Sequence, residues 1–488
     1  MRRLLAIVLT ALMVAPPALV SSAVAQVAEE KKLGDEFLAK ALPHMPLIHD
    51  YELAGFVSDV GNRLVKAVGP QPFDYEFFVV RDDEINAFAV PGGKLFVNAG
   101  LIARSDTEDQ LAGVVGHEIA HAAAHHVVRQ QEKGAAASYA SLLGIFLGII
   151  NPALAIGALA AGQAAQLSYQ RDFEREADYL GIGYARSAGY DPSAIAQILR
   201  KLYAEQQINP TQMPAYFMSH PLTGERLTSM EAVLGKAEWK AKAVPGSDRL
   251  HRAQAIARGY AQSREQCVPE YERALANATP AQRPEALELL GVLMTHGEDY
   301  ELADQYLRQA EQAGRNVDRE LGRTAFRRGQ LDEARLRLGR ALAKSPDDWD
   351  VLSDLGDIDY QEGRYGDAAI KLDRSVHLEA YRVQVVQSLS RALAKTGKEG
   401  AAYYWQGRSS QMLGDPSQAM VHFRHSMTLL PAGDPLREDI TKRSKDLGEE
   451  IKEEHAQQQQ DQQDQRTGRG PGGVPQMPMP MPRRAGGR

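Results

Sequence analysis

The sequence predicts an α+β domain, mostly helical with a small sheet, followed by an all-α solenoid of repeated helix pairs. Two histidines with helical spacing in GHEIAHAAAHH (116–126) indicate a metal-binding helix in the first half of the chain. Short apolar segments on either side of Pro91-Gly92-Gly93 predict two strands joined by a turn. From about residue 250 the sequence repeats with a period of 34 residues, which is typical of stacked helix hairpins.

The two ends of the chain differ from the rest in composition. Arg2 and Arg3 precede an apolar run over residues 4–14, and Ala23-Val24-Ala25 supplies small residues, a pattern that predicts a signal peptide cleaved after Ala25. Export from the cytoplasm is therefore expected. From residue 449 glutamine, glycine and proline replace large apolar residues, which predicts a disordered tail. The expected organisation is a signal peptide (1–25), a metal-binding domain (26–246), a repeat domain (247–448) and a tail (449–488).

Composition excludes some classes of protein. The 488 residues carry 56 basic and 63 acidic side chains, a net charge of −7, so nucleic-acid binding is not expected. Cys267 is the single cysteine, so no internal disulfide is possible and the fold depends on its hydrophobic cores.

The metal-binding motif is HEIAH. On a helix, His117 and His121 lie on one face, about 6 Å apart, and both can bind one ion. Glu118 lies beside that ion and can act as the general base on its water, which is the HExxH arrangement of zinc peptidases. We therefore expect one Zn²⁺ per chain. If the helix continues without a break, His125 lies too far along the axis and His126 points elsewhere, so both are expected to be solvated or hydrogen-bonded.

A third ligand is expected from SYQRDFEREADYLG (168–181). Glu174 and Asp178 are four residues apart on a predicted helix and share a face. Glu174 is the candidate ligand, and Asp178 would accept the second N–H of a ligand histidine. Glu176 is expected to point into solvent.

Together, HEIAH and EREADYLG resemble the gluzincin metallopeptidases that include the CAAX prenyl proteases and the heat-shock protease HtpX. The resemblance covers about residues 29–235 and implies a zincin-type metalloprotease domain. NAFAVPGGKLFVNAGLI (86–102) and SHPLTGER (219–226) match two further patterns of that family.

The resemblance also implies roles for residues outside the metal motif. An edge strand that pairs with the substrate backbone would include Asn86, Ala87, Phe88 and Ala89. His220 and Arg226 would stabilise the oxyanion of the reaction intermediate. Two other interpretations of His220 stay open: a latch in the metal's open position, or a structural histidine before a proline.

The 34-residue period resembles the tetratricopeptide repeat, with one additional helix expected at 380–394 outside the period. An exported gluzincin domain followed by such repeats is similar to periplasmic protease-chaperones of outer-membrane protein quality control. That architecture implies unfolded or misassembled proteins as substrates. It also implies the outer-membrane protein assembly machinery as a partner of the repeats.

Two questions are left open by the sequence. The segment 135–165 is apolar but is interrupted by Asn151-Pro152, so it predicts either a helical hairpin over the active site or a peripheral membrane contact. The predicted activity is that of an endopeptidase. The alternatives are a chaperone or adaptor with a latent or structural zinc site, and an exopeptidase, for which no charged pocket for a chain end is apparent.

Overall fold

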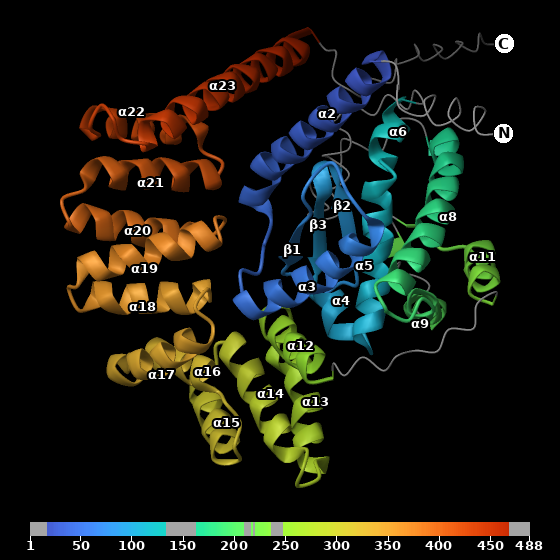
Figure 1. Cartoon of the computed structure of the whole chain (residues 1–488), viewed down its shortest axis with the longest axis horizontal. Helices are drawn as coiled ribbons and strands as arrows, with labels where there is room; N and C mark the ends of the chain where they lie inside the picture. Colours follow the sequence, from blue (N-terminus) through green and yellow to red (C-terminus); the bar gives the residue numbers. More distant parts are fainter. Residues whose placement is uncertain (1–16, 133–162, 209–215, 218–219, 236–246, 468–488) are drawn as a thin grey trace, which may run out of the picture. The chain divides into compact units, whose positions relative to one another are not determined.

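The computed structural model describes residues 17–132, 163–208, 216–217, 220–235 and 247–467. It forms two compact units, residues 1–385 and 386–488. The first unit contains a three-stranded sheet surrounded by helices, and the described chain after residue 247 is entirely helical (Figure 1). The predicted fold class is confirmed. Within the described ranges, no helix is both long enough and apolar enough to span a bilayer.

The sheet consists of β1 (Glu76–Val80), β3 (Lys94–Asn98) and β2 (Ala87–Val90), in that spatial order. Strand β3 pairs in parallel with β1 and antiparallel with β2. The short 3₁₀ turn Pro91–Gly93 joins β2 to β3, and Gly92 and Gly93 adopt φ values of 74° and 78°, where glycine is favoured. The predicted hairpin is therefore present, and β2 forms one edge of the sheet.

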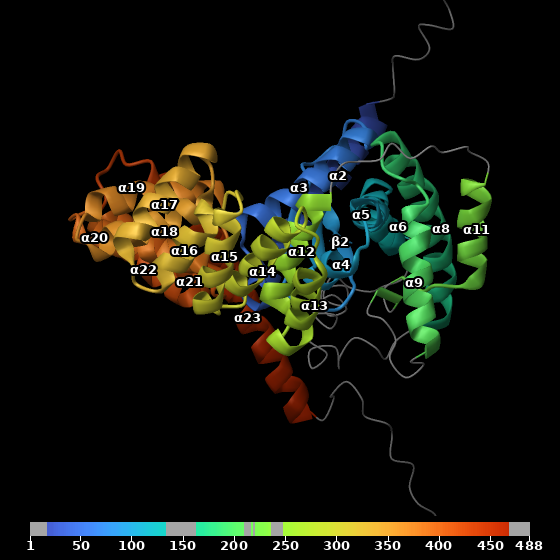
Figure 2. The ribbon, with the colours of Figure 1, turned by 90° about the horizontal axis from the view of Figure 1, so that it is seen from below.

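Helix α5 (Glu108–Ala123) is the central element of the first unit. Thr107 caps it by accepting a hydrogen bond from the backbone N–H of Gln110. Two acidic residues in the first turn interact favourably with the positive end of the helix dipole. The helix packs against β2, α3, α8 and α9, and α8, α9 and α11 lie together on one side of it (Figure 2). The helices around it are α2 (Pro17–Ala41), α3 (Tyr51–Val68), α4 (Ala99–Arg104), α6 (His126–Glu132), α8 (Gln163–Ser187), α9 (Ala194–Ile208) and α11 (Gly224–Leu234).

The predicted metal-binding helix is broken before His126, so the helical spacing assumed from the sequence does not extend to His125 and His126. Helix α5 ends at Ala123, and His125 adopts a left-handed φ of 52° before α6 begins at His126. This uncommon conformation is held by Glu30 of α2, whose Oε2 lies 2.6 Å from Nδ1 of His125. Because the helix breaks here, the His126 ring lies against His121 instead of pointing away from the metal-binding motif.

The repeats form helix pairs. The pairs are α14 (Arg283–His296) with α15 (Tyr300–Gln312), α16 (Asp318–Arg327) with α17 (Leu331–Lys344), α18 (Trp349–Gln361) with α19 (Tyr365–Leu378), and α21 (Glu399–Met412) with α22 (Pro416–Leu429). Helices α12 (Ser247–Ala261) and α13 (Arg264–Asn277) precede them. Helix α20 (Val383–Lys395) is the expected helix outside the period. Gly322 and Gly356 let paired helices approach closely, since an added β-carbon would lie within 3.0 Å of Leu338 or Leu372.

Four predictions concern the organisation of the chain. Helix α23 (Leu436–Thr467) continues into the tail that was predicted to be disordered from 449, because glutamine, glutamate and lysine propagate a helix without needing a buried face. The compact units do not divide near residue 246, since α12 to α19 belong to the same unit as the sheet. Helix α2 runs across the predicted cleavage site after Ala25. Most of 135–165 lies outside the described residues.

Candidate metal centre

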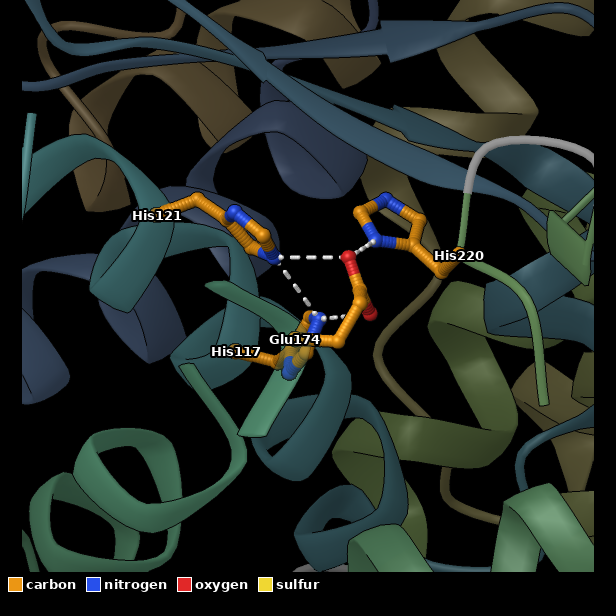
Figure 3. A group of neighbouring side chains, drawn as sticks. All are labelled: His117, His121, Glu174 and His220. Atoms are coloured by element: carbon orange, nitrogen blue, oxygen red, sulfur yellow. Dashed lines mark hydrogen bonds and ion pairs between the residues drawn. The ribbon is translucent and has the colours of Figure 1, made fainter. Parts of the chain in front are cut away.

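Three side chains from two helices converge at the end of α5. Nε2 of His117 lies 3.1 Å from Nε2 of His121 on the next turn. The two carboxylate oxygens of Glu174, on α8, lie 3.4 Å from Nε2 of His117 and 3.3 Å from Nε2 of His121. With His220, their candidate ligand atoms all fall within 4.8 Å of one another (Figure 3).

The separations between these atoms suit a tetrahedral metal ion. Bonds of 2.0–2.2 Å place tetrahedral ligand atoms about 3.4 Å apart, close to the distances between His117, His121 and Glu174. His117 and Glu174 are buried, whereas His121 is partly exposed. Two imidazoles and one carboxylate form a donor set that metal-dependent hydrolases use, with a fourth position left for water or substrate.

Glu118 lies beside this cluster and is itself buried. Among the described residues its Oε1 has no hydrogen-bond partner, although Nε2 of His220 is 3.4 Å away. Burial raises the pKa of Glu118, and the neighbouring His220 and His117 oppose that shift. A buried carboxylate with a raised pKa and a free oxygen is suited to accept a proton from a water molecule.

Asp178 and Arg226 lie behind the three candidate ligands. Oδ1 of Asp178 is 3.0 Å from Nδ1 of His117, on the side of the ring opposite Glu174. The Arg226 guanidinium donates two hydrogen bonds to Asp178, of 2.7 and 2.8 Å, and its Nη1 is 2.7 Å from Glu174. The structure thus places Arg226 against the carboxylates, where it holds them in position. This geometry differs from the expectation that Arg226 approaches a substrate carbonyl.

The two motif histidines have opposite electrostatic environments. Burial lowers the pKa of His117, but hydrogen bonds to Asp178 and Glu174 outweigh burial and raise that pKa to about 9. Burial dominates for His121, whose pKa falls to about 3 despite the opposing charge of Glu174. Burial also disfavours ionised Glu174, yet His220, Arg226 and His121 hold its pKa well below the usual value. Contacts between His117, Glu174, Asp178 and Arg226 hold these side chains together.

His220 enters the cluster from the segment before α11. Its Nδ1 lies 3.0 Å from Oε1 of Glu174, and its ring stacks on Tyr216 with centroids 4.8 Å apart. The side chain is 7% exposed. His220 therefore lies between Glu118 and Glu174, at the side of the cluster that a fourth ligand would occupy.

Comparison with known proteins shows which families parts of this chain match. Residues 53–234 match peptidase family M48, and residues 325–377 match the tetratricopeptide repeat. Residues 53–234 are an M48 domain. The predicted enzyme class, a metalloendopeptidase, is confirmed by this assignment and by the relatives that share the domain.

The relatives differ in how much of each chain is matched. The beta-barrel assembly-enhancing protease of Yersinia pestis is 29% identical over 70% of this chain and 72% of its own length. The protein of that name from Escherichia coli is 32% identical over 41% of this chain but only 43% of its own length. The mitochondrial metalloendopeptidase OMA1 of Schizosaccharomyces pombe is 32% identical over 40% of this chain and 57% of its own.

Strand β2 of the M48 domain contains three of the four residues expected to bind substrate. Ala87 and Phe88 are buried, with Phe88 stacked on Phe96 at 4.9 Å, and Ala89 is partly buried. The side chain of Asn86 is buried, and its carbonyl accepts a hydrogen bond from the N–H of Asn98. Because these side chains face inward, only the backbone edge of β2 could pair with an extended peptide.

Two residues near the metal motif were not predicted as part of the site. His126 is buried, with its Nδ1 2.9 Å from Nδ1 of His121, and Glu176 lies next to His126. Glu176 was expected to point into solvent. No glycine or proline lies between His117 and His125, so nothing in the local sequence indicates the helix break before His126.

Proposed function

We propose that this chain is a zinc-dependent endopeptidase of the periplasm. The observation that carries this proposal is the His117, His121 and Glu174 cluster in an M48 domain, with the buried carboxylate of Glu118 beside it. Two imidazoles and a carboxylate at these separations suit zinc, and Glu118 is the group placed to act as general base.

Each residue has a distinct part in the proposed reaction. Zinc, when bound, would polarise the scissile carbonyl and lower the pKa of its bound water. Glu118 would take a proton from that water, since its Oε1 is buried and without a hydrogen-bond partner among the described residues. Asp178 and Arg226 would keep His117 and Glu174 in their binding orientation. His220 would contact the oxyanion or the leaving group once it moves away from Glu174.

The substrates we propose are unfolded or misassembled proteins, within quality control of outer-membrane protein assembly. The edge strand β2, which pairs only with β3 among the described strands, supports this, because backbone pairing to a sheet edge tolerates many sequences. Relatives named beta-barrel assembly-enhancing protease support the process, and the tetratricopeptide repeats are proposed to contact the assembly machinery.

The deciding experiment compares the exported chain with its Glu118→Gln variant. Both are incubated with an unfolded model protein, and bound zinc is measured in both. We expect zinc in both and cleavage by the wild type alone, with products cut internally. Stepwise trimming from one end would instead identify an exopeptidase. Absence of zinc from the wild type would contradict the proposal.

A second candidate is a chaperone or adaptor in which the protease is latent. His220 favours it, because its ring lies between Glu118 and Glu174, where the reacting water would bind. If His220 is a latch, His220→Ala will raise basal cleavage and weaken zinc binding. Unchanged or lower basal cleavage in His220→Ala would rule the latch out.

A further inference from the structure

His121 has a polar partner on the side of its ring that faces away from the cluster. Its Nε2 points to His117 and Glu174, while its Nδ1 lies 2.9 Å from Nδ1 of His126. A contact of this length between two ring nitrogens requires one to donate and the other to accept.

The direction of this hydrogen bond follows from metal binding. If His121 binds the ion through Nε2, its Nδ1 keeps a hydrogen and donates it, so Nδ1 of His126 must accept. The remaining hydrogen of neutral His126 is then on Nε2. That atom faces Oε2 of Glu176 at 3.3 Å, and Arg129 donates to the same carboxylate at 3.1 Å. Only one tautomer of each ring satisfies all these contacts.

His126 is held in place by packing as well as by polar contacts. It is 3% exposed, and its ring stacks on Phe173 with centroids 4.5 Å apart and planes 24° apart. Phe173 directly precedes the candidate ligand Glu174 on α8, and Arg129 covers the Phe173 ring. The helix break at His125, where φ is 52°, precedes His126 directly.

We propose that His126, backed by Glu176, is the positioning residue of the metal ligand His121, as Asp178 is for His117. The inference rests on the proposed zinc site. Histidine ligands of metals commonly donate their second N–H to an outer partner, and loss of such a partner weakens metal binding about 10- to 100-fold. Here His117 contacts the carboxylate of Asp178 directly, whereas His121 is linked to the carboxylate of Glu176 through the imidazole of His126.

Zinc affinity, measured by competition with a chromophoric chelator, tests this without using activity. His126→Phe keeps the aromatic stacking but removes the acceptor, and we expect zinc binding about 10- to 100-fold weaker than wild type. His126→Asn retains an oxygen near the position of Nδ1 and should restore most of the affinity. Glu176→Gln should weaken zinc binding less than His126→Phe does. The control is Glu225→Gln, because Glu225 forms an exposed ion pair with Arg175 of α8.

The visible spectrum of the Co²⁺-loaded protein gives an independent readout. A shifted His121 ring should change the ligand-field bands in His126→Phe but not in Glu225→Gln. Wild-type zinc affinity together with an unchanged cobalt spectrum in His126→Phe would overturn the inference while leaving the proposed function intact. An Asn variant as weak as the Phe variant would overturn the acceptor role. If the wild type binds no zinc, both proposals fail.

Discussion

Arg226 is a buried cation that contacts both Asp178 and Glu174. Two buried carboxylates this close to each other are costly unless a cation compensates them, so removing one partner of the group should be strongly destabilising. We expect Arg226→Met to lower the unfolding free energy of the metal-free protein by about 3–5 kcal/mol.

Urea unfolding of chelator-treated protein, followed by circular dichroism, measures this change. Arg175→Met is the matched control, because Arg175 and its partner Glu225 are both substantially exposed and such pairs contribute about 0–1 kcal/mol. Equal losses in the two variants would mean that Arg226 does not compensate the buried carboxylates.

His296 predicts a pH dependence of stability. Burial lowers its pKa to about 4, opposed by the nearby Asp50 carboxylate, against 6.5 for the free side chain. Between these values the unfolded chain binds a proton that the folded protein does not, so stability falls as pH drops from about 6.5 to about 4. The loss from this group alone is about 3 kcal/mol.

Substituting His296 by glutamine removes that titration. The difference in urea midpoint between pH 7.5 and pH 4.5 should therefore be smaller in metal-free His296→Gln than in the metal-free wild type. An identical pH dependence in the two proteins would show that His296 is not buried as a neutral ring.

At the residue scale, the sequence could predict whatever depends on regular helical spacing. His117 and His121 share a face of α5, and the structure brings Glu174 and Asp178 to them. The prediction that His126 points away from the metal motif was wrong because it assumed an unbroken helix, whereas the expected hydrogen bond of His126 is present, to His121. The break depends on Glu30 of α2, 95 residues from His125 in the chain, which no local pattern could indicate.

At the scale of the element, the glycines of the repeat serve close helix packing. An added β-carbon at Gly322 would lie 2.8 Å from the Leu338 side chain and 3.0 Å from its backbone nitrogen, so Gly322→Ala forces the α16–α17 pair apart. Overpacking of this kind costs about 1–3 kcal/mol.

Gly339, in the middle of α17, is the matched control. No atom lies within 4 Å of a β-carbon added there, so Gly339→Ala should raise stability by about 0.5–1 kcal/mol through helix propensity alone. Thermal denaturation of both variants should thus give shifts of opposite sign. A stable Gly322→Ala variant would show that the helix pair can separate without loss.

The elements themselves were predictable where a pattern repeats or a turn has its own chemistry. The 34-residue period predicted the helix pairs, and Pro91-Gly92-Gly93 predicted the hairpin. Helix α23 was not predicted past residue 449, because low apolar content was taken as absence of structure. A polar segment that extends an existing helix only needs to propagate it, which glutamine and glutamate do well.

At the scale of the molecule, a buried network of ion pairs in the first unit joins residues that lie far apart in the sequence. Asp50 caps α3 of the M48 domain through the N–H groups of Glu52 and Leu53, and its other oxygen lies 3.3 Å from Arg319 of the repeats. Arg319 also contacts Asp348 at 2.9 Å and Asp350 at 2.8 Å. Asp350 in turn accepts the backbone N–H of Tyr51 at 2.8 Å.

This network places residues of α3 against α16 and α18, where 269 residues separate Asp50 from Arg319 along the chain. Because polar groups buried together depend on one another, the M48 domain and the first repeats should unfold as one cooperative unit. This explains why the compact unit extends to residue 385 and does not end at the predicted boundary near 246.

Arg319→Met tests that coupling. It removes the cation that contacts all three buried aspartates and leaves Arg323 against Asp50 and Asp350 only, so we expect a loss of about 3–5 kcal/mol. We also expect a second, separate urea transition, because the M48 domain would no longer be tied to the repeats. Arg340→Met, whose side chain is 54% exposed and 3.8 Å from Asp318, should change stability by less than about 1 kcal/mol. A single unshifted transition in Arg319→Met would mean that apolar contacts, such as the T-shaped pair of Tyr51 and Trp349, are sufficient to join the two parts.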